Sequence, residues 1–342
     1  MFGRAPKPIR VEIAGHTDLG RTRDHNEDCF LLADLTQRET WQAPGARTHD
    51  VGERGALLVV ADGMGGAAAG EVASQMATES IYAHLANTWM AERDGRAERF
   101  ALRLREAVES ANTRIHAHAA AHSEARGMGT TATAAGVLGD HVYLTQIGDS
   151  RAYLVRNGRA IQLTKDQSLT QRLVEAGEMT EEAAAQSDRK NIILQALGPD
   201  AKVKVDLTFQ ELRRDDVLVL CSDGLSGQVK KEEIADAVAR HPDLAHACER
   251  LIALANERGG PDNITVIIAR FDGEGLRPVE GAAEAGHQVY PLIDTEMSTE
   301  PVPVYRGSPP PRSAAQLSRA RLAALLVVAA AALVAWYLFR DP

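Results

Sequence analysis

Short apolar runs alternate with helical patterns along most of the chain, from residue 9 to residue 271. Runs that are rich in β-branched residues and bounded by Gly, Asp or Asn are typical of buried strands. We expect such strands at 29–33, 56–61, 131–138, 142–147, 152–156, 203–209, 217–221 and 264–271. Between neighbouring runs stand Gly139-Asp140 and Asn157-Gly158, which favour the tight turns of antiparallel hairpins.

Helical patterns separate these groups of strands, at 70–88, 97–121, 168–176, 231–240 and 244–258. Four apolar residues of the second segment share one helix face: Leu104, Val108, Ala111 and Ile115. Segment 37–55 carries a proline, glycines and mixed charges, and we expect a loop there between two strands. Central hairpins with helix pairs between strand groups predict one α+β domain, residues 9–271, built on antiparallel sheets.

Residues 272–321 differ from the preceding domain in composition. They carry scattered glycines, spaced prolines and the run Pro309-Pro310-Pro311, and they sustain no period of 2 or 3.6. Such a pattern is typical of a linker rather than of a second domain. We therefore expect a linker over 272–321.

The 18 residues at 322–339 contain no charged side chain. A helix of this length is about 27 Å long, close to the hydrocarbon thickness of a bilayer. Trp336 and Tyr337 stand near one end, where aromatic rings suit a membrane interface, and three arginines precede the run. We expect a single-pass transmembrane helix that keeps the preceding domain in the cytoplasm. The alternative is an Ala-rich helix buried in a core.

Charge and cysteine content limit the classes of function. The formal net charge of −9 excludes a bulk electrostatic attraction to nucleic acid. The cysteines Cys29, Cys221 and Cys248 are odd in number and far apart, which favours a reducing compartment over a disulfide framework.

Four aspartates lie at the ends of apolar runs, each beside a glycine or an asparagine: Asp62-Gly63, Gly148-Asp149, Asp223-Gly224 and Asp262-Asn263. A single Asp-Gly pair is most often only a turn. If these strands share one sandwich, however, the four carboxylates gather at one edge, where a cation must offset their mutual repulsion. Oxygen ligands of this kind suit Mg²⁺ or Mn²⁺ better than zinc. A glycine such as Gly63 also lets its backbone carbonyl approach the ion.

A second charged cluster lies upstream, at residues 23–28. Arg23 supplies a guanidinium that can hold a phosphate through two hydrogen bonds, and Glu27 and Asp28 add two carboxylates. Taken alone, this cluster is an ordinary charged turn.

Six short motifs occur in order: TDLGRTRDHNED at 17–28, ADGMGG at 61–66, GMGTT at 127–131, GDSRAYL at 148–154, SDG at 222–224 and PDNIT at 261–265. In this order and spacing the chain resembles the metal-dependent serine/threonine protein phosphatases of the PPM or type 2C family, in a bacterial form. The resemblance covers residues 10–271. It implies a four-layer α-β-β-α sandwich, with two stacked antiparallel sheets and helix pairs outside.

The resemblance also implies a metal centre with two divalent cations, Mn²⁺ or Mg²⁺. Asp62 would bridge the two ions, with the Gly63 carbonyl on one of them. Asp223 and Asp262 would bind the second ion. Asp149, together with Asp223, matches the position of a third, weaker metal.

Further roles follow from the same resemblance. Glu27 and Asp28 would hold metal-bound waters, Arg23 would hold the substrate phosphate, and segment 168–198 would be the mobile flap near the cleft. The implied reaction is hydrolysis of phosphoserine and phosphothreonine by a metal-activated water, with no covalent enzyme intermediate. Arg23 and Asp62 are therefore the expected catalytic residues.

The mechanism of hydrolysis also depends on the residues at positions 64, 67 and 221. Related enzymes place a histidine where this chain has Met64 or Ala67, so the acid for the leaving group is not identified. Cys221 lies within an apolar run with no phosphate-binding loop after it, so we expect a core thiol and not a nucleophile.

Two functions remain after these observations. The first is a phosphatase at a bacterial inner membrane, with phosphorylated proteins as partners, Ser/Thr kinases and their substrates among them. The alternative is a non-catalytic regulatory or binding module with a phosphatase fold at the membrane. Loss of Asp62, Asp223 or Asp262 would have favoured the module, and all three are present.

Overall fold

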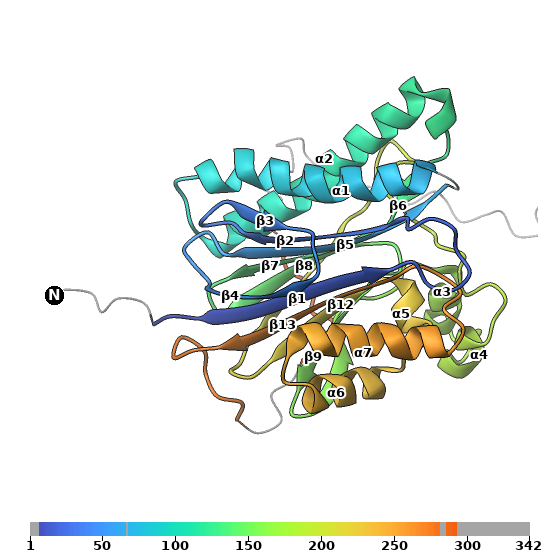
Figure 1. The fold of residues 1–342 in the computed structure, drawn as a ribbon. Coiled ribbons are helices and arrows are strands. Elements are labelled where there is room, and N and C mark those ends of the chain that lie inside the picture. Colours follow the sequence, from blue (N-terminus) through green and yellow to red (C-terminus); the bar gives the residue numbers. More distant parts are fainter. Residues whose placement is uncertain (1–6, 66–67, 281–284, 293–342) are drawn as a thin grey trace, which may run out of the picture. The chain divides into compact units, whose positions relative to one another are not determined.

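Two antiparallel sheets form the centre of the computed structural model, which describes residues 7–65, 68–280 and 285–292 (Figure 1). The six-stranded sheet has the order β10-β9-β12-β13-β1-β4. Its strands are β1 (Arg10–Asp18), β4 (Gly45–Asp50), β9 (Arg151–Arg156), β10 (Arg159–Gln162), β12 (Val217–Cys221) and β13 (Ile264–Asp272). The seven-stranded sheet has the order β11-β8-β7-β5-β2-β3, and β6 pairs with β5. Its strands are β2 (Asp28–Asp34), β3 (Glu39–Trp41), β5 (Ala56–Met64), β6 (Gly129–Thr130), β7 (Ala132–Leu138), β8 (His141–Ile147) and β11 (Asp206–Glu211).

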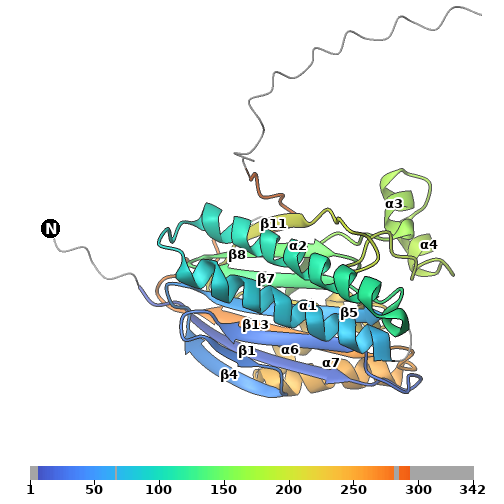
Figure 2. The ribbon, with the colours of Figure 1, turned by 90° about the horizontal axis from the view of Figure 1, so that it is seen from above.

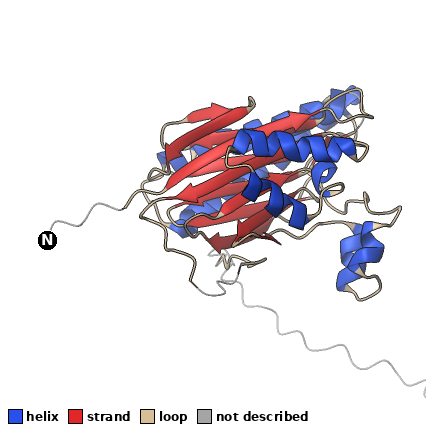
Figure 3. Ribbon diagram, turned by 60° about the horizontal axis from the view of Figure 1, so that its bottom comes forward, coloured by secondary structure: helices blue, strands red, loops and turns tan. Residues whose placement is uncertain are grey.

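Helices cover the outer faces of both sheets. The long pair α1 (Ala68–Asn87) and α2 (Ala97–Ala121) lies on the seven-stranded sheet, and α6 (Lys231–Arg240) and α7 (Leu244–Glu257) lie on the other (Figure 1). Two single turns, η1 (Trp89–Ala91) and η2 (Ser123–Ala125), flank α2, and the short α5 (Asp223–Ser226) follows β12. The helices α3 (Leu169–Glu175) and α4 (Glu181–Ala185) stand apart from the sandwich (Figure 2 and Figure 3).

Three apolar cores hold these layers together. One fills the space between the two sheets, with Phe30 and Phe271 among its fully buried residues. The second lies between α1, α2 and the seven-stranded sheet, and the third between α6, α7 and the six-stranded sheet. Trp89 packs against Phe100 in the second core, with the ring centroids 5.0 Å apart and the rings tilted at 52°. The predicted α-β-β-α sandwich is therefore confirmed.

Most predicted elements are present. Both predicted hairpins form, and three of their four turn residues have positive φ: Gly139 (56°), Asn157 (51°) and Gly158 (71°). The helices α2 and α6 have the predicted bounds, whereas the strand expected at 203–209 is found three residues later, as β11. The sequence patterns did not predict β1, β10 or α4.

The expectation of a plain loop at 37–55 is wrong, because this segment contains β3 and β4. Each is an edge strand, and β4 is exposed at five of its six residues. An exposed edge strand needs no alternation of apolar and polar residues, so the pattern that reveals buried strands is missing here. The pairing of β4 with β1 decides its conformation.

The compact unit extends to Leu292, beyond residue 271, where we expected the domain to end. Leu276 is 2% exposed in the core between the sheets, and Tyr290 packs against the core beneath α1 and α2. The rest of the predicted linker and the predicted transmembrane segment 322–339 lie outside the described residues. Among the helices of the described part, none is both long and apolar enough to cross a bilayer.

Candidate functional site

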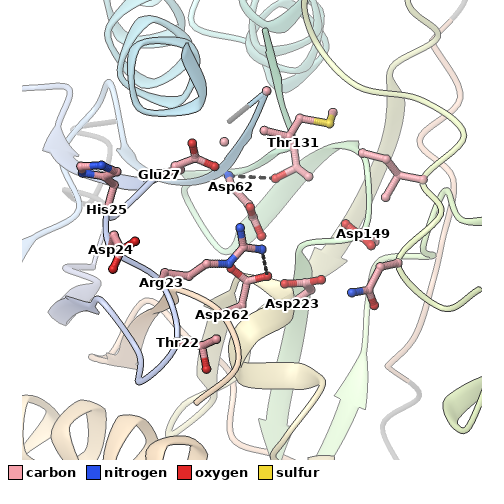
Figure 4. A pocket seen from close by; sticks show the side chains of 15 residues that line it. Thr22, Arg23, Asp24, His25, Glu27, Asp62, Thr131, Asp149, Asp223 and Asp262 are labelled. Atoms are coloured by element: carbon pink, nitrogen blue, oxygen red, sulfur yellow. Dashed lines mark hydrogen bonds and ion pairs between the residues drawn. The ribbon is translucent and has the colours of Figure 1, made fainter. Parts of the chain in front are cut away.

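A cleft of about 440 Å³ opens at the end of the sandwich where β5 and β12 end and β13 begins (Figure 4). Its wall includes the four aspartates that the sequence placed at the ends of apolar runs: Asp62, Asp149, Asp223 and Asp262. Arg23 and Glu27, from the loop before β2, line the same cleft. The tertiary structure thus brings together residues that are up to 239 positions apart.

Asp62 is held in place by backbone contacts within the seven-stranded sheet. It lies opposite Asp28 in the pairing of β5 with β2. Its amide N–H donates to Thr131 Oγ1 at 3.0 Å, and its carbonyl accepts from the Thr131 amide at 2.8 Å. The Thr131 hydroxyl in turn contacts Ser150 Oγ at 2.8 Å. This network orients the Asp62 carboxylate toward the cleft without using it as a hydrogen-bond partner.

Gly63 is required by close packing at this point. A Cβ added there would lie 2.2 Å from the carbonyl oxygen of Gly70 and 2.5 Å from that of Glu27. Helix α1 therefore approaches β5 more closely than any side chain would allow. The Gly63 backbone lines the cleft beside Asp62, as a carbonyl ligand for a cation would require.

Asn263 joins the two halves of the site, and the sequence patterns gave it no role. Its side-chain amide donates to the carbonyls of Leu19 and His25, both at 2.9 Å. Its Oδ1 accepts from the Glu27 amide at 2.9 Å. The loop that carries Arg23 is thus fixed against the residue next to Asp262.

Asp28 lies behind the cleft and does not line it. Its side chain is 8% exposed and accepts a hydrogen bond from Ser222 Oγ at 2.8 Å. Burial, together with the charges of Asp223 and Asp262, raises the pKa of Asp28 to about 7. Any contact of this carboxylate with a cation would therefore be indirect.

The carboxylates of the cleft repel one another. Burial and then the charges of Asp28, Asp223 and Asp149 raise the pKa of Asp62 well above its ordinary value. Burial and the charge of Asp223 raise the pKa of Asp149 to about 7. The pKa of Asp223 rises through burial and the charge of Asp262. Such a cluster of buried like charges is unfavourable until a cation offsets it.

Arg23 is the cation that lies among these carboxylates. Its Nη2 donates to Asp262 Oδ2 at 2.8 Å, and Figure 4 shows its guanidinium beside Asp62 and Asp223. This hydrogen bond raises the pKa of Arg23 above its ordinary value. The arginine side chain is 48% exposed, so it is free to turn toward solvent.

The donor set fits hard divalent cations. It consists of carboxylate oxygens and one backbone carbonyl, with no cysteine or histidine nitrogen among the buried ligands, and such sets prefer Mg²⁺ or Mn²⁺. Within the described residues, no three His, Cys, Asp or Glu side chains are close enough to hold one ion by themselves. The Gly63 carbonyl and water would have to complete the coordination, and Arg23 would have to leave Asp262.

The flap (residues 168–198) is tied to the Asp149 loop through Gln167. Gln167 Oε1 accepts from the Gly148 amide at 2.9 Å and from Gln195 Nε2 at 3.0 Å. Its Nε2 donates to Asp206 Oδ2 at 2.9 Å. Asn191 and Ile193 of the flap also line the cleft.

Cys221 is a core thiol, as expected. It is fully buried in β12, and burial raises its pKa to about 12, so it is not a nucleophile. The three cysteines are all free.

Comparison with known proteins agrees with this site. Residues 46–265 match the family model described as protein phosphatase 2C. The serine/threonine protein phosphatase PstP of Mycobacterium tuberculosis is 38% identical over 279 residues, which make up 81% of this chain and 48% of PstP. The chain thus spans about half the length of that relative. The serine/threonine phosphatase stp of Listeria monocytogenes is 36% identical over 257 residues, covering 75% of this chain and 94% of stp. The crystal structure of the PstP catalytic domain with two manganese ions has a TM-score of 0.62 and 38% identity, and the match covers 77% of this chain and 99% of that one.

Proposed function

Because the chain belongs to the protein phosphatase 2C family, we propose that it hydrolyses phosphoserine and phosphothreonine in proteins at the acidic cleft. One observation carries this proposal: four carboxylates from both sheets and Arg23 line a single cleft of about 440 Å³. The substrates we propose are phosphorylated proteins, Ser/Thr kinases and their targets among them.

Asp62, the Gly63 carbonyl, Asp223 and Asp262 would hold two divalent cations, Mn²⁺ or Mg²⁺, and Asp149 with Asp223 a third. When bound, the cations supply a water of lowered pKa and stabilise charge on the phosphoryl group. The crystal structure of the PstP catalytic domain with two manganese ions supports this choice of metal. Glu27 lines the cleft and can orient water there, whereas Asp28 would act from behind it.

Arg23 can pair either with Asp262 or with the phosphoryl group of a substrate. Once cations neutralise Asp262, the attraction that holds the guanidinium in its 2.8 Å ion pair is lost. Its fork geometry then suits two oxygens of a phosphoryl group, which it would hold while charge develops on them. In the absence of cations the same arginine partly offsets the carboxylates.

The leaving group needs a proton, but the position where related enzymes have a histidine holds Met64, which lines the cleft. Ala67, the other position considered, lies outside the described residues. His25 borders the cleft, but Figure 4 shows its ring pointing away from the carboxylates. We therefore assign no leaving-group acid to a side chain.

The test is release of phosphate from phosphothreonine peptides by the full-length chain and by residues 1–292, with Mn²⁺ and with a chelator. We expect activity only with the metal. Asp62→Asn should lower it at least about a hundredfold, since a charge-stabilising group is lost. The matched control is Asp236→Asn, whose side chain is 68% exposed on α6 and which should stay active. An inactive parent protein with native folding would favour the non-catalytic module instead.

We also propose that residues 322–339 tether the phosphatase domain to a membrane. The support is the uncharged run of 18 residues and the arginines before it. After cell fractionation, the full-length chain should be found in the membrane pellet and a chain ending at residue 321 in the supernatant. Recovery of the full-length chain in the supernatant would refute the tether.

A further inference from the structure

The acidic cleft continues past Arg23 into a second space of about 270 Å³, which we call the side lobe. The flap residues Lys190 and Asn191 line the side lobe, together with Ser226 and Gln228, at the end of α5 and just after it. The side lobe shares Arg23, Asn191 and three carboxylates with the main cleft. A side chain next to a phosphoresidue bound in the main cleft would therefore enter the side lobe.

The cations of the side lobe differ in what they already bind. Arg151 is held by Asp166, with Nε and Nη2 at 2.9 and 2.7 Å from its carboxylate oxygens. Lys190 is exposed, and no carboxylate among the described residues lies within ion-pair distance of its ammonium group. Arg23 is paired with Asp262 and, in the proposed function, would hold the scissile phosphoryl group. Lys190 is thus the cation of the side lobe that is left for a flanking group.

The position of Lys190 is defined by the backbone around it. Its amide donates to Ser187 O at 3.2 Å. Two residues further on, Ile192 O accepts from the Leu169 amide at 2.8 Å, and the Leu194 amide donates to Gln167 O at 2.7 Å. Gln167 in turn holds the Gly148 amide beside Asp149. The lysine is therefore presented from a segment that is bonded to the rim of the catalytic cleft.

The remaining wall of the side lobe is polar. Ser226, Gln228, Asn191 and the backbone of Gly224 and Gly227 line it, and no large apolar side chain does. Such a space suits a charged or polar side chain and offers little to a hydrophobic one. Of its carboxylates, Asp149, Asp223 and Asp262 are those that the proposed cations would neutralise, and Asp166 is paired with Arg151. This leaves Lys190 to determine which charge is accepted.

We propose that Lys190 and Asn191 form a subsite for an anionic side chain that lies close in sequence to the scissile phosphoresidue. Lys190 would pair with this group, and the Asn191 amide would donate a hydrogen bond to it. The ligand is a carboxylate or a second phosphate on the same peptide. This subsite rests on the proposed phosphatase activity, because it is the bound cations that remove the competing negative charge.

The test compares phosphothreonine peptides that differ only in the flanking residues, assayed on the full-length protein with Mn²⁺. The flanks are alanine, glutamate, phosphoserine or lysine, placed on either side. We expect kcat/KM to be about two- to fivefold higher with an anionic flank than with alanine, as one partly exposed ion pair allows. The preference should shrink at high salt.

Variants at position 190 identify the source of that preference. Lys190→Gln should abolish it, Lys190→Arg should keep it, and Lys190→Glu should reverse it in favour of the lysine flank. Lys202→Gln is the matched control, because Lys202 is an exposed lysine that does not line the side lobe. The glutamate and phosphoserine arms distinguish a carboxylate ligand from a second phosphate.

Two results would overturn the subsite: equal kcat/KM for anionic and neutral flanks in the parent protein, or a preference that Lys190→Gln leaves intact. A binding measurement keeps the proposal separate from the activity. Fluorescence anisotropy of labelled peptides that carry a non-hydrolysable phosphonate in place of the phosphothreonine phosphate, on the parent protein and on Lys190→Gln with Mn²⁺, measures binding to the subsite with no turnover. If the parent protein releases no phosphate from any phosphothreonine peptide, the phosphatase proposal fails, while equal binding of all flanks by the parent protein in this measurement counts against the subsite.

Discussion

Asp149 and its neighbours make the stability of the metal-free protein depend on pH. The pKa of Asp149 is raised from its ordinary value of 3.8 to about 7 by burial and by the charge of Asp223. Between these two values the folded protein binds a proton that the unfolded chain has released. Stability from such a group is present at low pH and is lost as the pH rises through 7.

We therefore predict that, in a chelator, the free energy of unfolding falls by about 2–4 kcal/mol between pH 5 and pH 8. Urea unfolding of residues 1–292 at a series of pH values measures this change. Asp149→Asn should flatten the dependence, because the amide carries no charge. A free energy of unfolding that rises over this range would show that burial and mutual repulsion do not disfavour the charged carboxylates in the folded protein.

A second prediction concerns the buried ion pair of Arg156 and Asp216, at the opposite end of β12 from the cleft. The two side chains are 3% and 0% exposed, and Asp216 accepts from Arg156 at 2.8 and 2.6 Å and from the Arg213 amide at 2.7 Å. Asp216→Ala leaves a buried guanidinium without its partner, so it should cost about 3–5 kcal/mol of unfolding free energy.

Chemical denaturation of residues 1–292 measures this loss. Asp236→Ala removes one partner of the exposed pair with Arg240 and serves as the control. It should change stability by less than about 1 kcal/mol. Equal effects of the two substitutions would contradict the argument from burial.

At the scale of elements, the segment after β13 completes the edge of the seven-stranded sheet. Along β11 the Phe209 amide donates to Gln288 O at 3.0 Å, and the Tyr290 amide donates to Leu207 O at 2.9 Å. The Tyr290 ring meets the edges of Phe209 and Tyr143 at 5.2 and 5.4 Å. Residues 287–292 thus cover an edge strand that would otherwise be open to pairing.

We predict that Tyr290→Ala lowers the free energy of unfolding by about 1–2 kcal/mol, since two aromatic contacts are lost. A chain that ends at residue 271 should unfold at a lower temperature than residues 1–292 and should aggregate more readily. Thermal unfolding monitored together with light scattering tests both. Identical melting of the two chains would mean that residues 272–292 add nothing to the domain.

At the scale of the whole molecule, the carboxylates of the cleft come from both sheets. Asp62 belongs to β5 of the seven-stranded sheet, whereas Asp223 follows β12 and Asp262 precedes β13 of the six-stranded sheet. Cations bound in the cleft through these carboxylates would join the two halves of the sandwich. Their binding free energy would then add to the stability of the entire domain and not only to that of one loop.

We predict that Mn²⁺ at about a hundred times its dissociation constant adds about 2.7 kcal/mol to the free energy of unfolding. The same addition to Asp62→Asn should have much less effect. Unfolding of residues 1–292 over a series of metal concentrations measures the difference. Equal stabilisation of the parent and the variant would place the ion elsewhere.

Much of the fold and of the candidate site could be predicted from local patterns. Apolar runs that end in Asp-Gly located Asp62 and Asp223, because burial and turn formation each require particular residue types at consecutive positions. The same runs and the hairpin dipeptides indicated antiparallel sheets. The anionic composition had a related cause, since part of the net charge of −9 lies in the carboxylates of the cleft.

Other features of the fold and the site depend on contacts between residues that are far apart in the chain. The edge strand β4 forms through its pairing with β1, Asn263 bonds to the loop at 19–27, and Gln167 connects the flap with Gly148. Leu276 and Tyr290 extend the folded unit into a segment that has the composition of a linker. Hydrogen bonds and packing between distant residues leave no local period. Local sequence patterns are therefore enough to identify the residues that can carry the chemistry, whereas the packing of the two sheets brings those residues together.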